Sequence, residues 1–132
     1  MQELSTASPL VGIVDDDSSV GRSLSRLLRS HGINPRQYTS GASLLADSDL
    51  SKADCLIVDI HMPKMSGYEL ANRLSRELPE VPIIFITAQA EELNRWQDTA
   101  SAAMALLIKP FSHRDLGTSL ERALGHPLAL SN

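Results

Sequence analysis

Acidic residues follow two of the apolar runs in this sequence. Asp15, Asp16 and Asp17 come directly after the first run, and Asp59 follows a later one. Carboxylates that converge on one site repel each other, and a hard divalent cation relieves that repulsion. Oxygen ligands alone favour Mg²⁺, Mn²⁺ or Ca²⁺ over zinc. The spacing therefore predicts a divalent-metal site that uses Asp15, Asp16 and Asp59, provided that the fold brings the two runs together.

Helix capping is an alternative role for the three consecutive aspartates. Asp is common at N-caps and in the first turn of helices, and a helical pattern begins directly after Asp17. For Asp17 the capping role and the site role are equally consistent with the sequence, because two aspartates remain for the metal site if the third caps the helix. Asp15 and Asp16 are assigned to the site.

Two further polar residues stand at the ends of apolar runs. Thr87 follows Ile83 to Ile86, and Lys109 follows Leu106 to Ile108. Each alone is an ordinary strand-end residue. Beside a carboxylate cluster, the lysine is a counter-charge, and both side chains could contact the oxygens of a phosphoryl group. An acceptor carboxylate, a metal, a cation and a hydroxyl donor are what phosphoryl transfer requires.

The elements that must position these residues alternate strictly along the chain. Apolar runs without period-two alternation indicate strands covered on both faces, and right-handed crossovers then give a parallel sheet between helices. This is a flavodoxin-like doubly wound α/β fold, in which ligands bind at the carboxyl ends of the strands. We expect five strands near 10–14, 34–38, 55–60, 83–86 and 106–108, and five helices after them, the fourth near 90–101.

The size and composition of the chain bound its organisation. At 132 residues it fits one domain, with flexible tails predicted at residues 1–8 and 126–132, the latter a C-terminal tail or the start of a linker, around a domain at 9–125. The net charge of −4 and the lack of a dense basic run argue against direct nucleic-acid binding. No apolar stretch approaches the roughly 18 residues needed to span a membrane, and the single cysteine, Cys55, fits a reduced, cytoplasmic compartment.

Four short motifs surround the candidate site residues. They are Ile13-Val14-Asp15-Asp16-Asp17, Leu56-Ile57-Val58-Asp59-Ile60-His61-Met62-Pro63-Lys64-Met65-Ser66-Gly67, Ile86-Thr87-Ala88 and Ile108-Lys109-Pro110-Phe111. The most specific is the Asp-x-x-Met-Pro-x-Met-x-Gly stretch that begins at Asp59. In this order and spacing, the motifs resemble those of the receiver domains of two-component response regulators. The resemblance covers roughly residues 9–124 and implies the receiver fold.

The resemblance implies a role for each site residue. Asp59 is implied as the phosphoacceptor, and Thr87 and Lys109 as contacts of the phosphoryl group. The implied ligands of Mg²⁺, with Mn²⁺ as an alternative, are Asp59, Asp15, Asp16 and the backbone carbonyl of His61. A cis peptide bond is expected between Lys109 and Pro110.

The resemblance also implies partners. The phosphoryl donor is implied to be a sensor histidine kinase or a histidine phosphotransfer protein. The reader of the signal is implied to be a downstream protein or an output domain outside this chain. Such a domain assists its own phosphorylation and dephosphorylation but is not otherwise an enzyme.

One position departs from the family pattern. Leu106 stands where most relatives carry Tyr or Phe, so the aromatic switch that usually reports phosphorylation is missing. We expect the site to accept a phosphoryl group and the coupling to the output surface to be altered. His61 and Gln89, each two residues beyond a site residue, occupy positions that the resemblance links to the lifetime of the phosphoryl group.

Two other readings of the same residues compete. A phosphatase of the haloacid dehalogenase type also forms an aspartyl phosphate, and the stretch from Asp15 to Val20 satisfies its Asp-x-Asp-x-(Thr/Val) pattern. That family needs a further acidic pair near the last strand, and no such pair follows Lys109. The second alternative is a receiver fold used as a docking module without phosphorylation; the intact set of site residues argues against it.

Overall fold

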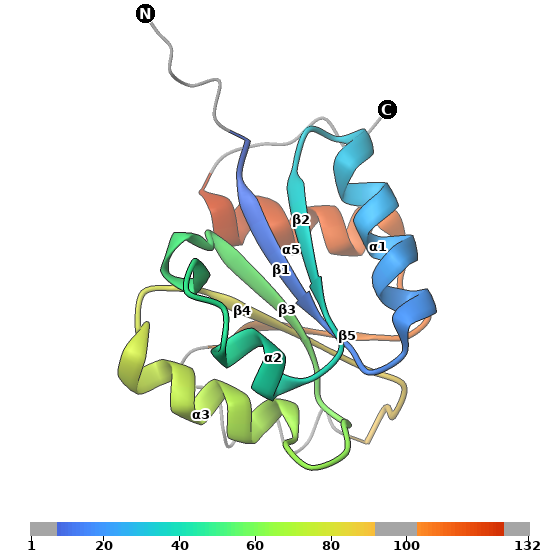
Figure 1. Cartoon of the computed structure of the whole chain (residues 1–132). Coiled ribbons are helices and arrows are strands. Elements are labelled where there is room, and N and C mark those ends of the chain that lie inside the picture. The colour runs from blue at the N-terminus through green and yellow to red at the C-terminus, as the bar shows by residue number, and fades with distance from the viewer. Residues whose placement is uncertain (1–7, 92–102, 126–132) are drawn as a thin grey trace, which may run out of the picture.

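The computed structural model describes residues 8–91 and 103–125, which form a five-stranded parallel sheet with helices on both faces (Figure 1). The strand order is β2-β1-β3-β4-β5, so the chain reverses direction across the sheet between β1 and β3, as in doubly wound folds. The predicted fold is confirmed. The elements are β1 (Leu10–Val14), α1 (Ser18–Ser30), β2 (Asn34–Tyr38), α2 (Gly41–Leu45), the 3₁₀ helix η2 (Leu50–Lys52), β3 (Cys55–Asp59), α3 (Gly67–Glu77), β4 (Ile83–Thr87), β5 (Ala103–Ile108) and α5 (His113–Leu124).

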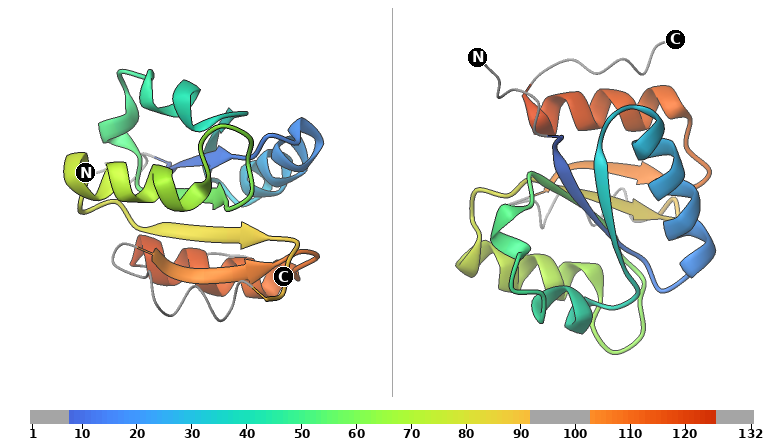
Figure 2. Two further views of the ribbon diagram at one scale, coloured as in Figure 1. Left: turned by 90° about the horizontal axis from the view of Figure 1, so that it is seen from below. Right: turned by 45° about the horizontal axis from the view of Figure 1, so that its top comes forward.

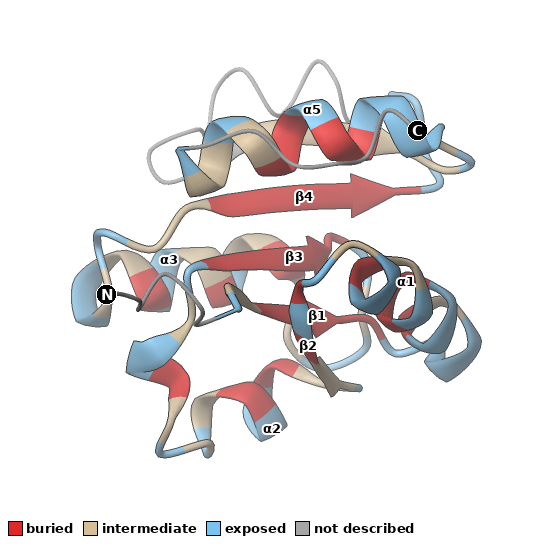
Figure 3. Ribbon diagram, turned by 90° about the horizontal axis from the view of Figure 1, so that it is seen from above, coloured by how far each residue is buried: buried red, intermediate tan, exposed pale blue. Residues whose placement is uncertain are grey.

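Helices α1 and α5 cover one face of the sheet, and α2 and α3 cover the other (Figure 2). All five residues of β3 and of β4 are buried, and Figure 3 shows the buried band along the central strands. This explains why those runs are apolar throughout rather than alternating. The α1/α5 layer is built on Leu24, Leu28, Leu116 and Leu120, and the α2/α3 layer on Leu44, Leu70 and Leu74.

Side-chain caps fix where the helices begin. The Ser66 hydroxyl accepts from the N–H of Glu69, whose carboxylate accepts from the N–H of Ser66, which completes a capping box for α3. The Ser112 hydroxyl accepts from the N–H of Asp115 at 3.0 Å and starts α5. Each of these helices starts a few residues after a strand, so the loops at this edge of the sheet are short.

The structure differs from the sequence-based expectation at element ends. β5 begins at Ala103, three residues earlier than expected, because pairing with β4 recruits Ala103 to Ala105 although alanine has a weak strand preference. Pro35, which has no N–H to donate to a neighbouring strand, lies on β2, and β2 is an outer strand of the sheet. The helix expected at 90–101 falls almost entirely outside the described residues, and the domain limits stay predictions.

Among the described residues, no helix is long and apolar enough to cross a membrane.

Candidate functional site

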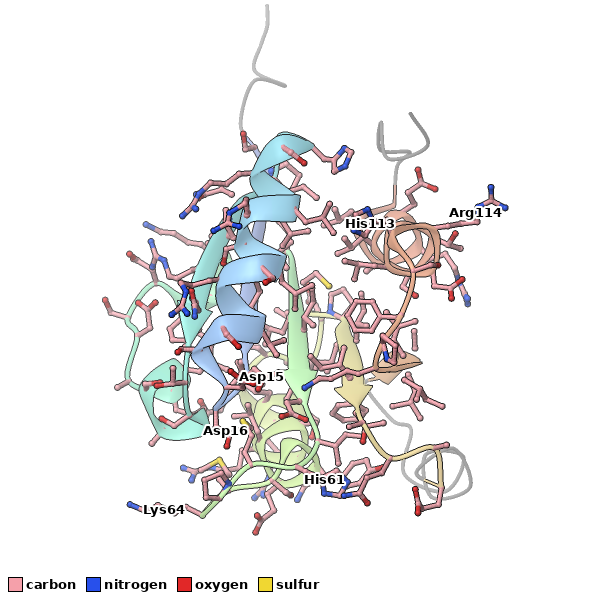
Figure 4. The ribbon with its side chains drawn as sticks, turned by 90° about the vertical axis from the view of Figure 1, so that its right-hand side faces the viewer. Asp15, Asp16, His61, Lys64, His113 and Arg114 are labelled. Atoms are coloured by element: carbon pink, nitrogen blue, oxygen red, sulfur yellow. The ribbon has the colours of Figure 1, made fainter. Side chains whose placement is uncertain are left out.

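Four strands end at one edge of the sheet, and each contributes a polar residue there. Asp15 follows β1, Asp59 is the last residue of β3, Thr87 is the last residue of β4, and Lys109 follows β5. Since the strands are parallel and β1 pairs with β3, Asp15 and Asp59 stand side by side. The predicted convergence of Asp15, Asp16 and Asp59 is confirmed, and Figure 4 shows Asp15 and Asp16 near the start of α1.

The carboxylates form a compact cluster with one open side. One oxygen from each of Asp15, Asp16 and Asp59 lies within 4.8 Å of the others. Asp15 is 1% exposed and Asp59 is 6% exposed, whereas Asp16 is open to solvent. Oxygen donors at this spacing, with access from one side, fit a hard divalent cation that keeps some of its water ligands.

Lys109 supplies the counter-charge. Its ammonium Nζ lies 3.0 Å from Oδ2 of Asp15 and 3.8 Å from Oδ2 of Asp59. The Lys109 N–H donates to the carbonyl of Thr87 at 2.7 Å, which ties the start of the loop to the end of β4. The Lys109–Pro110 peptide bond is cis, as predicted.

The two oxygens of Asp59 have different surroundings. Oδ1 accepts from the backbone N–H of His61 at 3.2 Å, and Oδ2 faces Lys109. Burial, and then the negative charge of Asp15, raise the pKa of Asp59 to about 6, although Lys109 and the His61 N–H act to lower it. The carboxylate is therefore costly to keep ionised without a further positive charge.

Asp17 caps α1 and also orients Asp15. Its carboxylate accepts from the Ser19 hydroxyl and from the Ser19 N–H at 3.0 Å, and these hydrogen bonds lower the pKa of Asp17. Its own N–H donates to Oδ1 of Asp15 at 2.9 Å. Of the two roles left open by the sequence, the structure shows the capping role. The orienting N–H groups of Asp17 and His61 were missed, because a backbone donor leaves no signature in residue type.

The loop between β3 and α3 is held against the site by a close backbone contact. The Gly67 N–H donates to the carbonyl of Ile60 at 2.8 Å. A Cβ at Gly67 would lie 2.5 Å from the carbonyl oxygen of Asp59 and 2.8 Å from Cα of Ile60. The loop also needs a positive φ of 70° at Lys64, whose side chain points away from the cluster (Figure 4). Only glycine fits at position 67, which explains its place in the motif.

Thr87 lies on β4, next to β3 in the sheet, and Leu106 lies on the outer strand β5. Thr87 is fully buried, and its hydroxyl accepts from the N–H of Gln89 at 3.1 Å. Leu106 pairs in register with Phe85 and packs against the α2/α3 layer. The contact of Thr87 with a phosphoryl group, and the His61 carbonyl as a metal ligand, stay predictions.

The sequence comparisons agree with this geometry. The family model of the response regulator receiver domain matches residues 11–121. Response regulator protein TmoT of Ectopseudomonas mendocina is 32% identical over 123 residues, which are 93% of this chain and 56% of TmoT. The C4-dicarboxylate transport transcriptional regulatory protein DctR of Rhodobacter capsulatus is 39% identical over 105 residues, 77% of this chain and 53% of DctR. The chain thus spans little more than half the length of these curated relatives.

Solved structures of response regulators also resemble this chain. A response regulator receiver protein from Burkholderia phymatum is 39% identical and has a TM-score of 0.78, with 92% of this chain and 99% of that chain covered. Response regulator StyR is 33% identical with a TM-score of 0.76, and the match covers 90% of this chain and 60% of StyR. This chain belongs to the response regulator receiver domain family.

Proposed function

We propose that Asp59 of this chain accepts a phosphoryl group in a two-component or phosphorelay pathway. The observation that carries the proposal is the position of Asp59. It is a buried carboxylate at the end of the central strand, within 4.8 Å of oxygens of Asp15 and Asp16, with Lys109 at 3.8 Å on the other side. A carboxylate in this position can accept a phosphoryl group with the proposed metal ion on one side and the Lys109 ammonium on the other.

The transfer forms one bond and breaks another. An Asp59 carboxylate oxygen attacks the phosphorus of a phosphohistidine, the O–P bond forms, and the N–P bond breaks as the imidazole leaves. The Lys109 ammonium and the Thr87 hydroxyl bind oxygens of the transferred group, which spread the charge of the transition state. Asp15, Asp16, Asp59 and the His61 carbonyl are the proposed ligands of Mg²⁺, which supplies positive charge for the same oxygens.

The proposed donor is a sensor histidine kinase or a histidine phosphotransfer protein, and the proposed compartment is the cytoplasm. A downstream protein, or an output domain beyond this chain, reads the phosphorylated state. In this proposal the chain assists only its own phosphorylation and dephosphorylation. Receiver domains are signalling domains rather than conventional enzymes, and the partial coverage of the curated relatives fits a receiver that works with a further domain.

Intact mass spectrometry tests the proposal. The chain is incubated with Mg²⁺ and acetyl phosphate, and we expect one added phosphoryl group. The adduct is absent from Asp59→Asn and is present in Asp47→Asn, a matched control on an aspartate outside the cluster. Absence of any adduct, with acetyl phosphate and with a phosphohistidine protein alike, leaves the docking module as the better description. An adduct on Asp15 with turnover of a phosphoester supports the phosphatase alternative instead.

A further inference from the structure

A polar groove lies between α1 and β2, away from the Asp59 site. It has a volume of about 170 Å³ and is lined by Arg22, Ser25, Arg26, Arg29, Pro35 and Gln37. The side of α1 that carries Val20 and Leu27 lines a different, mainly apolar groove together with Lys109. The four residues of α1 in the polar groove follow an i, i+3, i+4, i+7 pattern, so they share the opposite side of the helix. The polar groove is therefore separate from the Asp59 site.

The groove is strongly basic in an acidic chain. The chain has a net charge of −4, yet α1 contains three arginines and no Asp or Glu. The three guanidinium groups are exposed. Within residues 8–91 and 103–125 none of them forms an ion pair, and the hydrogen bond of Arg22 is to the Ser18 hydroxyl at 3.3 Å. Three positive charges along about 10 Å of helix therefore lack a counter-charge in the described part of the chain.

Ser25 gives an independent sign of a ligand. It is 5% exposed and lines the groove, and no described residue donates to or accepts from its hydroxyl. The hydroxyls of Ser30 and Ser75, on other turns of the helices, donate to backbone carbonyls of their own helix, to Leu27 at 2.6 Å and to Asn72 at 2.7 Å. Buried polar groups in folded proteins are nearly always hydrogen-bonded. The Ser25 hydroxyl is thus a buried donor available to a ligand in the groove.

The walls of the groove are fixed by contacts between α1 and β2. The side-chain amide of Gln37 donates to the carbonyl of Ser18 at 3.1 Å. A Cβ at Gly21 would lie 2.4 Å from the same amide nitrogen, so Gln37 lies directly on the helix. The arginines and Ser25 therefore face a groove whose two sides are held at a set distance before any ligand binds.

We propose that this groove binds a small molecule through a diphosphate group. Three guanidinium forks and a hydroxyl offer many more donors than the two oxygens of one carboxylate can accept. Two linked phosphates provide several acceptor oxygens and a charge that matches three arginines over two helical turns. The Ser25 hydroxyl donates to one phosphate at the base of the groove, and Arg22, Arg26 and Arg29 bind the outer oxygens.

Calorimetric titration with inorganic pyrophosphate in metal-free buffer at low salt tests the assignment, because without a divalent cation the acidic Asp59 site repels the probe. We expect saturable one-to-one binding that Arg26→Gln weakens by about tenfold or more and Ser25→Ala by several-fold. Arg114→Gln is the matched control, since it removes the same charge from an exposed position on α5 (Figure 4). Its affinity for pyrophosphate should stay within about twofold of the parent, the loss expected from long-range charge alone.

Three results would overturn the site. The first is absence of saturable pyrophosphate binding, and the second is an equal loss in Arg114→Gln and Arg26→Gln, which would indicate general charge attraction. The third is stronger binding of a short DNA duplex or a poly-glutamate peptide than of pyrophosphate, lost in Arg26→Gln, which would assign the arginines to a macromolecule. Asp59→Asn should bind pyrophosphate as tightly as the parent does. A negative result for pyrophosphate binding therefore leaves the proposal of phosphoryl acceptance by Asp59 untouched, and the reverse also holds.

Discussion

The ammonium of Lys109 lies 3.0 Å from Oδ2 of Asp15, a carboxylate that is 1% exposed. The same ammonium is 3.8 Å from Asp59. Lys109 therefore partly neutralises two carboxylates of the proposed metal site. The two proposed effects of the lysine, weaker metal binding and assistance to the phosphoryl group, can be measured separately.

Replacement of Lys109 should separate these effects. In Lys109→Gln we expect roughly tenfold tighter Mg²⁺ binding, because a positive charge within about 4 Å of the carboxylates is removed. Phosphorylation from acetyl phosphate should slow by about tenfold or more, because the cation for the phosphoryl oxygens is lost. Calorimetry gives the first quantity and the time course of the mass adduct gives the second. Lys64→Gln, whose side chain points away from the cluster, should change neither. Parallel loss of both properties in Lys109→Gln would contradict the assignment.

Asp59 should make the stability of the metal-free chain depend on pH. Its pKa is raised from 3.8 to about 6, so the folded state holds the proton more tightly than the unfolded state. The favourable contribution of the protonated form is present below about pH 4 and is lost as the pH rises through 6. Asp59→Asn should therefore be more stable than the parent by roughly 1–3 kcal/mol at pH 7, with little difference at pH 4. Urea unfolding at both pH values measures this, and an Asn variant that is less stable at pH 7 would refute it.

The contact between Tyr38 and Asp47 should have the opposite pH dependence. The Tyr38 hydroxyl donates to Asp47, which also pairs with Arg36 at 3.0 Å, and these contacts lower the pKa of Asp47 to about 2. The stability that this carboxylate provides is present above about pH 4 and is lost as the pH falls through 2. Tyr38→Phe should flatten this dependence and lower stability at pH 7 by about 1 kcal/mol. A double-mutant cycle with Asp47→Asn, followed by urea unfolding, should give a coupling energy that decreases as the pH falls through 2.

Gly67 should be intolerant of any side chain. A Cβ would meet the backbone of Asp59 and Ile60 at 2.5 and 2.8 Å, and backbone atoms cannot move aside cheaply. Gly67→Ala should cost about 2 kcal/mol or more and weaken Mg²⁺ binding, because the loop that carries His61 is displaced. Gly32→Ala is the control. Gly32 has a φ of 78° with nothing within 4 Å of its Cβ position, so the variant should cost about 1 kcal/mol and leave Mg²⁺ affinity unchanged.

Much of the fold could be predicted because the buried strands are apolar throughout and end abruptly in polar residues. Cys55 to Val58 and Ile83 to Ile86 are unambiguous for this reason. The parallel topology then places Asp15, Asp59, Thr87 and Lys109 at one edge without further information. The start of β5 at Ala103 could not be predicted in this way, since only pairing with β4 makes that segment a strand.

Interactions that depend on geometry rather than residue type were not predictable. The short helix η2 and the Tyr38–Asp47 contact depend on how the chain after α2 turns back toward β3. The hydrogen bonds from the Asp17 and His61 N–H groups depend on loop conformation. The unpaired hydroxyl of Ser25 becomes notable only when its burial against β2 is known.

The edge position of β2 leaves one wall of the arginine-lined groove on an outer strand. Asp15, Asp59, Thr87 and Lys109 stand at the ends of β1, β3, β4 and β5, whereas Pro35 and Gln37 of β2 line the groove beside the arginines of α1. Substitutions at these two positions of β2 therefore change the shape of the groove and leave both the arginines and the residues of the Asp59 site in place. The groove and the Asp59 site can in this way be varied separately.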